Sequence, residues 1–502
     1  MASTGFAVDD GSRIMQEMVQ IHSSMEELTL KMPSPSHITS FYNIEATAAR
    51  IKTHGFQRIA LQFPDAMLSD ANQVQNQLRD ALAALNYTIE RIFVLGDTSY
   101  GSCCVDEVAA QHLLADCVVH YGRACLSPTS SLPVIYVFGN AACDVSAIVS
   151  GLDGSIASFD LTTQHVLLYE PCYQHKAEEI FQALAARYPD RKFTCSVMRT
   201  MYDPRNKNDG DADTATSTFL GGMTISLAPS ELFSPTSLLL YIGKESPHLT
   251  NVLLRAGETP CVSFNPHSNT VREESSSVNR TLKRRYFLVQ KAKEAQIIGI
   301  LMGTLGVASY LDVVKTLQEL IAKSGRKAYT FVVGKINVPK LSNFAEIDAF
   351  CLVACAENTL LDSSEFFKPI VTPFELMLAL TDDSSWTSQY KADFREVLPS
   401  MHQAVDEMEH DEYKRDEPFF SLVTGKYHQM HVQDDSDGDE IDASSSALVS
   451  REGNRQLATY KSEAADFLAQ REYQGLDPRV GETAPHAAVQ GSSGIARGYT
   501  HE

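Results

Sequence analysis

Short, unbroken apolar runs are the feature that most limits how this 502-residue chain can fold. They recur between residues 58 and 353, separated by longer segments whose apolar residues follow a helical period. Strands without polar–apolar alternation are buried on both faces, which is typical of a parallel sheet flanked by helices. The sequence therefore predicts an α/β fold. The expected strands are Arg58–Phe63, Arg91–Gly96, Cys117–His120, Val134–Phe138, His165–Tyr169, Phe193–Met198, Leu238–Ile242, Cys261–Phe264, Gln296–Leu301, Tyr329–Val333 and Ala349–Val353.

The same pattern restarts twice, which predicts three consecutive and similar units, each a small parallel sheet flanked by helices. A candidate site is expected where these units converge. Beyond about residue 426 the chain becomes acidic and small-residue-rich, and such a composition is typical of a disordered linker. The predicted divisions are a flexible leader at 1–39, α/β units at 40–158, 159–290 and 291–426, and an acidic tail with a short docking segment at 427–502.

The net charge of −21 limits the classes of partner. A nucleic-acid backbone or an anionic membrane surface requires a basic face, so we expect neither as a partner. The N-terminus has no basic segment followed by an apolar core, and no apolar run reaches the roughly 20 residues that span a bilayer. We therefore expect a cytoplasmic protein.

Three of the ten cysteines follow predicted strands. Cys103 comes after the strand RIFV, Cys125 after CVVHY, and Cys355 after AFCLV. Loops at the carboxyl ends of parallel strands converge on the ligand crevice of an α/β fold, so these thiols could meet there. Thiolates are the ligands that iron–sulfur clusters select. Three of them would hold a 4Fe-4S cluster and leave its fourth iron open.

Spacing alone favours a plainer interpretation, because buried cysteines are more often core residues than ligands. Cys104 adjoins Cys103 and is an alternative to it. Cys117 and Cys351 lie inside apolar strands and are expected in the core. Zinc is the competing metal, although the sequence has no Cys-x-x-Cys pair for an ordinary structural zinc site.

Four longer segments carry a resemblance to a known family. They are IALQFPD at Ile59–Asp65, the stretch GDTSYGSCCVDEVAAQHLLADCVVHYGRACLSPTSSLPVIYVFG at Gly96–Gly139, YIGKESPHLTNVL at Tyr241–Leu253, and Glu346–Leu376, which contains EIDAFCLVACAEN and FFKPIVTPFEL. Together they resemble the diphthamide-synthase family, in the family's order, over about residues 40–380.

The resemblance implies an α/β protein of three units and a radical enzyme. In this family a 4Fe-4S cluster held by three cysteines cleaves S-adenosylmethionine, and the 3-amino-3-carboxypropyl group is transferred to a histidine of translation elongation factor 2. This is the first step of diphthamide formation. The eukaryotic enzyme is a heterodimer of two related subunits, and the family also implies a small iron-binding electron donor with its reductase.

Within the family the chain looks like subunit 2. Members of the catalytic type have a Leu-Gly-Cys motif where this chain has Leu220, Gly221 and Gly222. The resemblance implies ligands at Cys103 and Cys355, with Cys125 as the third. It also implies that the partner, subunit 1, binds S-adenosylmethionine, while this chain supports the partner's cluster and helps to reduce it. A purely structural partner without a cluster and a self-sufficient homodimeric transferase remain as alternatives.

Overall fold

The structure is a computed structural model, and most of the chain up to residue 410 is described. The described residues are 37–96, 100–206, 216–360, 366–381, 390–410, 419–420 and 427–428. Nearly all of the predicted leader and of the predicted acidic tail lies outside these residues. None of the described helices has both the length and the apolar character needed to cross a bilayer.

The first sheet follows the predicted strands closely. It contains β1 (Arg58–Gln62), β2 (Arg91–Val94), β3 (Cys117–Tyr121) and β4 (Val134–Val137), which are parallel in the order β2-β1-β3-β4. Helices α2 (Ile38–Phe41), α3 (Ile44–His54) and α4 (Ala71–Ala84) cover one face, where Ile59, Leu61 and Val119 are buried. The short α5 (Glu107–His112) lies on the other side of the sheet and precedes β3.

The second sheet contains β5 (Gln164–Tyr169), β6 (Lys192–Cys195), β11 (Ser237–Ile242) and β12 (Cys261–Asn265), parallel in the order β6-β5-β11-β12. The antiparallel β13 (Thr270–Glu273) closes one edge. Its helices are α6 (Val145–Ala157), α7 (Ala177–Arg187), α8 (Pro229–Leu232) and α9 (Pro247–Ala256). A small antiparallel sheet, β7 (Val197–Met198), β10 (Met223–Ile225) and β9 (Thr218–Leu220), lies beside it.

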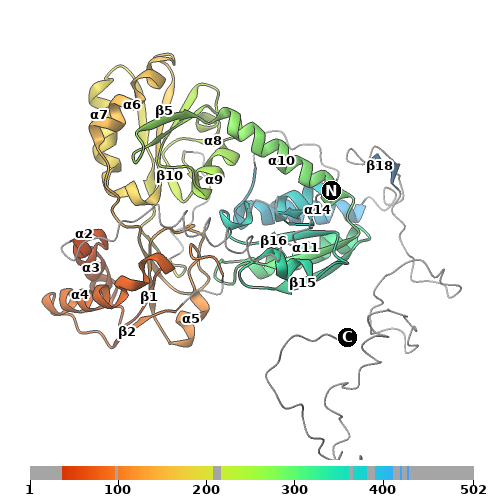
Figure 1. The fold of residues 1–502 in the computed structure, drawn as a ribbon, viewed down its shortest axis with the longest axis horizontal. Helices are drawn as coiled ribbons and strands as arrows, with labels where there is room; N and C mark the ends of the chain where they lie inside the picture. Colours follow the sequence, from red (N-terminus) through yellow and green to blue (C-terminus); the bar gives the residue numbers. More distant parts are fainter. Residues whose placement is uncertain are drawn as a thin grey trace, which may run out of the picture. The chain divides into compact units, whose positions relative to one another are not determined.

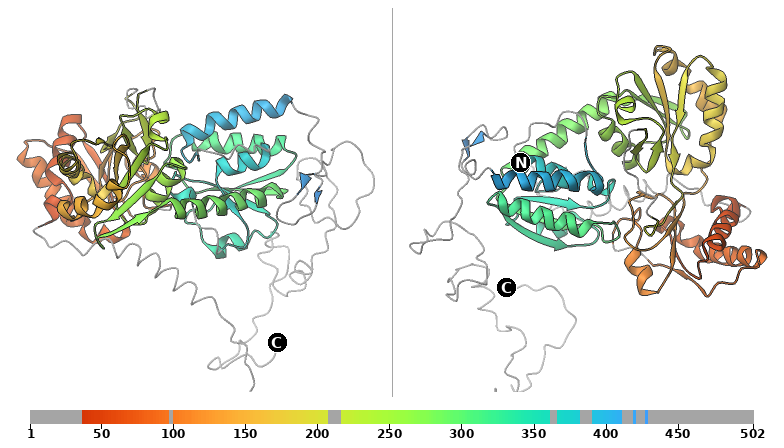
Figure 2. Two further views of the ribbon diagram at one scale, coloured as in Figure 1. Left: turned by 90° about the horizontal axis from the view of Figure 1, so that it is seen from above. Right: turned by 180° about the vertical axis from the view of Figure 1, so that it is seen from behind.

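The third sheet contains β14 (Ile297–Met302), β15 (Lys327–Val332), β16 (Ala349–Val353) and β17 (Ile370–Val371), parallel in the order β15-β14-β16-β17. Helices α10 (Ser275–Lys293), α11 (Tyr310–Lys323), α13 (Pro373–Thr381) and α14 (Phe394–His410) pack together on one face, as Figure 2 shows. The short α12 (Val338–Ser342) packs on the opposite face through Leu341.

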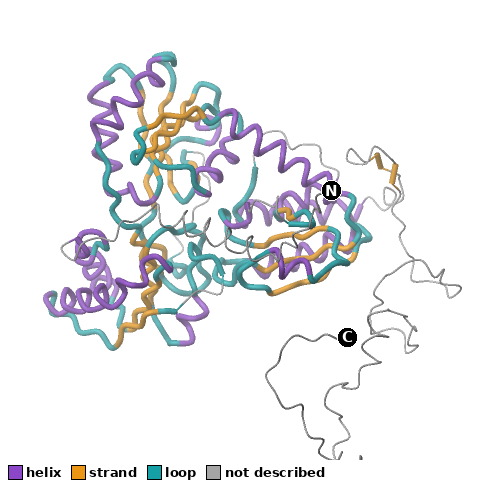
Figure 3. The backbone as a smooth tube through the Cα atoms, in the orientation of Figure 1, coloured by secondary structure: helices purple, strands orange, loops and turns teal. Residues whose placement is uncertain are grey.

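The three parallel sheets, whose strands are orange in Figure 3, share one strand order. In each, the first strand in sequence lies between the second and the third, and the fourth follows the third. The predicted α/β class is therefore confirmed. One predicted strand is wrong in its extent, because Phe193–Met198 divides at Ser196 into β6, which pairs with β5, and β7, which pairs with β10. Buried Ser196 donates its hydroxyl to Met223 Sδ, 3.2 Å away, at this division.

One strand joins the first sheet from much later in the chain. The two-residue strand β8 (Met201–Tyr202) pairs antiparallel with β4, although it lies within the range predicted for the second unit. Arg50 on α3 reinforces this contact by donating to the carbonyl and the hydroxyl oxygen of Thr200. Hydrogen bonds, in addition to the continuous backbone, therefore join the first sheet to the region of the second sheet.

A buried ion pair joins α10 to α13. Arg285 Nε and Nη2 lie 2.6 and 2.5 Å from the two carboxylate oxygens of Glu375, which is fully buried. Glu375 also accepts from the amide of Thr372 and the hydroxyl of Tyr390. Every carboxylate oxygen therefore has donors, as a charge in this environment requires.

Removing the cation should destabilise the third-sheet region strongly. Arg285→Met leaves the buried Glu375 carboxylate without its counter-charge, and we expect a loss of about 3–5 kcal/mol in the free energy of unfolding. Urea unfolding followed by circular dichroism measures it. Arg280→Met, an exposed position on the same helix, should change stability by no more than about 0.5 kcal/mol. Equal effects of both changes would contradict the assigned role of the pair.

Candidate metal centre

Four cysteine side chains meet at one point. Cys103 and Cys104 follow β2, Cys125 follows β3, and Cys355 follows β16. Their four sulfur atoms all lie within 4.8 Å of one another. Cys103 Sγ is 3.7 Å from Cys355 Sγ, and Cys104 Sγ is 4.0 Å from Cys125 Sγ. The structure thus brings the three predicted residues together and adds Cys104, which the sequence offered only as a substitute for Cys103.

Backbone and side-chain hydrogen bonds hold the two loops of the first sheet in place. The amide of Cys125 donates to the carbonyl oxygen of Cys103 at 3.1 Å. Gln62, the buried last residue of β1, donates to the carbonyl oxygen of Cys104 at 2.8 Å and accepts from the amide of Asp106 at 2.8 Å. The positions of three thiols therefore depend on the end of one central strand.

Two glycines let the third sheet approach these loops. A Cβ on Gly306, in the loop after β14, would lie 2.1 Å from the carbonyl oxygen of Val105. A Cβ on Gly101 would lie 2.0 Å from the side-chain nitrogen of Asn358. At Gly306 the neighbour is backbone, so only glycine permits the approach, whereas at Gly101 the Asn358 side chain would have to move. The first contact brings the loop after β14 against the loop of Cys103 and Cys104, and the second brings the loop of Cys355 against it.

Burial and mutual hydrogen bonding set the acidity of the thiols. Hydrogen bonds from Cys103, Cys104 and Cys355 hold the pKa of Cys125 well below its usual value. Hydrogen bonding to neighbouring thiols, chiefly Cys103, raises the pKa of both Cys104 and Cys355. A metal that binds this set must displace the protons that the raised pKa values retain on Cys104 and Cys355.

Polar groups near the cysteines are buried, and some have no hydrogen-bond partner. Nδ1 of His120 and the hydroxyl of Tyr136 are buried without a hydrogen-bond partner among the described residues. Oε2 of Glu357 is paired with Arg123, whose Nη1 lies 3.1 Å away. Burial raises the pKa of Glu357 to about 7, against the opposing effect of Arg123. Arg123 and Glu357 each lie two residues from a clustered cysteine, and His120 contacts Ser102, which precedes Cys103.

This donor set fits a thiolate-bound metal group. The set has four cysteine sulfurs, with Cys125 partly buried and the other three cysteines buried, and no carboxylate or imidazole. Such a set is typical of zinc or iron–sulfur binding. Sulfurs bound at ~2.3 Å to one tetrahedral ion lie about 3.8 Å apart, close to the two observed separations. A four-iron cube holds its thiolates at its outer corners, so cluster binding requires the loops to spread. The unpartnered polar atoms leave hydrogen-bonding capacity for the added group.

Among the described residues, neither the second sheet nor the small antiparallel sheet beside it contributes a cysteine to the set. Gly222 lies in the turn between β9 and β10, where the resemblance implies a cysteine in members of the catalytic type. It has φ +78°, and a Cβ there would lie 2.3 Å from Cδ1 of Leu126. Leu126 directly follows Cys125 and adopts φ +55°, which is uncommon outside glycine. The leucine therefore fills the space beside this turn, while Cys125 supplies a thiol from the first sheet.

The remaining cysteines are not part of this set. Cys117 and Cys351 are fully buried in β3 and β16, which confirms their predicted place in the core. All ten cysteines are free thiols. His120 is near the cysteines, but its Nε2 faces the carbonyl oxygen of Ser102 at 3.2 Å. The pair Arg123–Glu357 was not predicted from the sequence. The only sequence feature that pointed to it is that each residue lies two positions from a predicted ligand.

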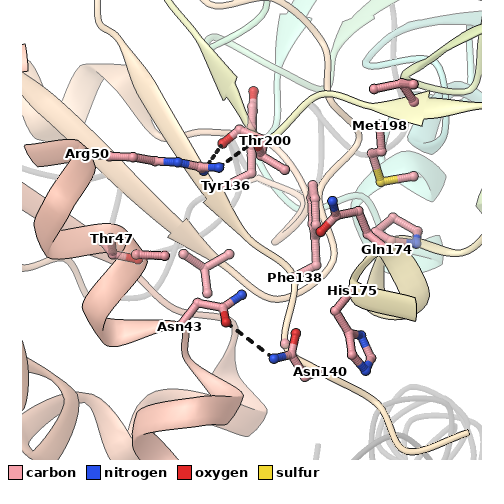
Figure 4. Close-up of a pocket in the computed structure, with 15 residues that line it drawn as sticks. Asn43, Thr47, Arg50, Tyr136, Phe138, Asn140, Gln174, His175, Met198 and Thr200 are labelled. Carbon is pink, nitrogen blue, oxygen red and sulfur yellow. Dashed lines mark hydrogen bonds between the residues drawn. The ribbon is translucent and has the colours of Figure 1, made fainter. Parts of the chain in front are cut away.

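A separate cavity of about 260 Å³ lies between α3, the end of β4 and the segment after β5 (Figure 4). Arg50 turns toward Thr200 at one side of it, and Asn43 and Asn140 approach each other at the other, 3.3 Å apart. His175 also lines it. None of the four clustered cysteines lines this cavity, so it is distinct from the metal centre.

A family model described as "Putative diphthamide synthesis protein" matches residues 63–391, which include all four clustered cysteines. The match covers more than half of the chain. The chain belongs to the diphthamide synthesis family.

Relatives in this family are similar over nearly the whole chain. The protein named 2-(3-amino-3-carboxypropyl)histidine synthase subunit 2 from Danio rerio is 39% identical over 473 residues, covering 92% of this chain and 91% of the relative. The protein of the same name from Schizosaccharomyces pombe is 39% identical over 479 residues, covering 93% and 91%. The predicted family resemblance, including the likeness to subunit 2, is therefore confirmed.

Solved structures show the same fold at lower identity. The crystal structure of Dph2 from Pyrococcus horikoshii aligns with a TM-score of 0.51 at 19% identity and covers 70% of this chain and 94% of that one. A second structure of that protein, titled as containing a 4Fe-4S cluster, aligns with a TM-score of 0.50 and covers 70% and 92%. At this identity the likeness concerns the architecture of the diphthamide synthesis fold.

The close approach at Gly306 should be necessary for metal retention. Gly306→Ala pushes a methyl group against the carbonyl oxygen of Val105, and we expect a destabilisation of about 1–3 kcal/mol together with reduced metal content. Thermal unfolding and elemental analysis of the purified chain measure both. Gly154→Ala, in α6 with nothing within 4 Å, is the matched control and should be neutral or stabilising. Unchanged metal content in Gly306→Ala would contradict this role.

Proposed function

We propose that this chain is the iron–sulfur subunit of the complex that transfers a 3-amino-3-carboxypropyl group from S-adenosylmethionine to a histidine of translation elongation factor 2. This is the first step of diphthamide biosynthesis, and we place it in the cytoplasm. The observation that carries the proposal is the buried set of thiols drawn from the first and third sheets. The names of the relatives, which all end in "subunit 2", support the assignment.

Cys103, Cys125 and Cys355 would hold the cluster. When bound, a 4Fe-4S cluster supplies one-electron redox chemistry. The residues around it have separate tasks. Burial limits the access of water to the sulfurs, and Gln62 fixes the loop of Cys104. The hydroxyl of Tyr136 and Nδ1 of His120 are buried without a partner among the described residues, and we infer that they form hydrogen bonds when a cluster is bound. Such hydrogen bonds tune the potential of an iron–sulfur centre.

The departure at Gly222 supports a division of labour between subunits. Leu126 fills the space beside Gly222, and the described residues offer no other ligand from the turn between β9 and β10. We assign S-adenosylmethionine binding and group transfer to the partner, subunit 1. This chain would support the fold of that partner and help to reduce its cluster. A small iron-binding donor and its reductase would supply the electrons.

The repeated strand order supports an origin of the fold in three similar units. Each parallel sheet has the first strand flanked by the second and third, and two of the three sheets supply thiols from the carboxyl ends of their strands. We propose unit boundaries near residues 158 and 290, followed by an acidic linker. The thiols then lie where the first and third units converge.

A structural metal site is the second candidate function. The sulfur separations of 3.7 and 4.0 Å match a single tetrahedral ion, and a zinc ion there would pin the first sheet to the third without redox chemistry. The chain would then be a purely structural partner. A self-sufficient homodimeric transferase is disfavoured, because Gly222 removes the ligand that catalytic members carry.

Metal analysis of the chain purified without oxygen decides between iron and zinc. We expect about four irons and four sulfides per chain. The triple variant Cys103→Ser, Cys125→Ser, Cys355→Ser should lose nearly all of both, because serine oxygen is a poor substitute for thiolate on iron. The matched control replaces Cys143, Cys172 and Cys195, three partly buried cysteines outside the set, and should retain the metal. One zinc per chain, or full iron in the first triple variant, contradicts the proposal.

The source of electrons separates a reducing role from a structural one. We expect the complex of subunit 1 with the cysteine triple variant to modify elongation factor 2 when dithionite is the reductant. With the biological donor and its reductase, the same complex should be slower by at least about tenfold, since the relay is missing. The complex with the control variant should work with both. An equal loss of activity with both reductants would indicate that the thiols serve only to stabilise the fold.

A further inference from the structure

We propose that Cys104 is a fourth thiolate ligand, so that the cluster of this chain is fully coordinated and closed to small molecules. The proposal rests on the proposed function and sharpens it. A cluster with three thiolates leaves one iron open to a substrate, whereas four thiolates leave none open. The chain's own cluster is then restricted to passing electrons.

By its sulfur–sulfur distances, Cys104 qualifies as a ligand in the same way as the other three cysteines. Its sulfur is within 4.8 Å of each of them and 4.0 Å from that of Cys125. Cys103 instead lies 3.7 Å from Cys355. Adjacent residues commonly point in opposite directions, but here a turn closed by the Cys104 amide on the carbonyl oxygen of Gly101, at 3.1 Å, directs both thiols to one point.

The Cys104 loop is held as firmly as a ligand loop requires. The carbonyl oxygen of Cys104 accepts a hydrogen bond from the Gln62 side chain. The amide of Asp106, two residues further on, donates to the same side chain. Cys104 itself is only 5% exposed. If Cys104 did not bind iron, its thiol would be a free nucleophile next to the metal. As a ligand, the same sulfur is bound to iron.

A cavity beside Cys104 gives small molecules a route to the thiols. This cavity, about 210 Å³, is lined by Cys104, Tyr100, His112 and Leu305, and by none of the other three clustered cysteines. A small molecule that enters it therefore meets Cys104 first. With Cys104 as a fourth ligand, each iron of a bound cluster would have its own thiolate, and S-adenosylmethionine would have no iron to bind.

The redox consequence is a simple electron relay. One electron enters from a protein donor of low potential and one leaves to the cluster of the partner subunit, with no bond made or broken in this chain. Any iron–sulfur protein that can reduce a 4Fe-4S centre has the chemistry needed to serve as the electron donor. The group transfer stays with the partner.

Oxidation with ferricyanide tests the coordination number. A three-thiolate cluster loses its unprotected iron and gives the electron paramagnetic resonance signal of a 3Fe-4S cluster, whereas a four-thiolate cluster keeps its iron under mild oxidation. We expect the anaerobically purified chain to keep its iron. Cys104→Ala should lose about a quarter of its iron and gain the three-iron signal. Cys143→Ser, outside the set, should behave as the unchanged chain does.

Each outcome has a defined meaning. Loss of a quarter of the iron from the unchanged chain overturns the proposal without any variant, so a poorly folded Cys104→Ala cannot hide the answer. Identical iron retention in Cys104→Ala and the unchanged chain also overturns it. A chain that contains no iron at all contradicts the proposed function instead, and the two failures are therefore distinguishable.

Discussion

The contact between a loop of the first sheet and a loop of the third is the constraint on which the candidate site depends. Cys103 and Cys355 are 252 residues apart, and their sulfurs meet because Gly306 and Gly101 allow backbone and side chains to approach without a Cβ between them. The amide of Ala308 adds a hydrogen bond to the carbonyl oxygen of Pro128 at 2.8 Å. The site is therefore a product of tertiary packing, and no local motif could build it.

Sequence reasoning found the strands and three of the thiols for one physical reason. Strands buried on both faces produce unbroken apolar runs, and loops after parallel strands gather at one edge. It could not assign Cys104, because the direction of two neighbouring side chains depends on a turn that only the structure reveals. The sequence also predicted β6 and β7 as one strand. The strand divides at Ser196 because its two parts pair with different sheets, which the sequence does not reveal. Helices α10, α13 and α14 were not predicted, and their buried contacts, such as Arg285 with Glu375, are equally non-local.

The turn between β9 and β10 differs from what the resemblance implies for catalytic members. Gly222 in this turn has a left-handed conformation and packs against Leu126, so no side chain from the turn enters the space beside Cys125. The first sheet supplies Cys103, Cys104 and Cys125, and the third sheet supplies Cys355. The result is a set of four thiols from two sheets, with Arg123 and Glu357 as the charged pair beside it.

We propose that thiolates from distant parts of the chain hold one iron–sulfur cluster. X-ray absorption at the iron edge, on the chain purified without oxygen, reports directly on the atoms bound to iron. We expect iron surrounded by sulfur, with a second shell of neighbouring iron atoms. Iron with oxygen or nitrogen neighbours, a single metal without the iron shell, or absorption only at the zinc edge would contradict it.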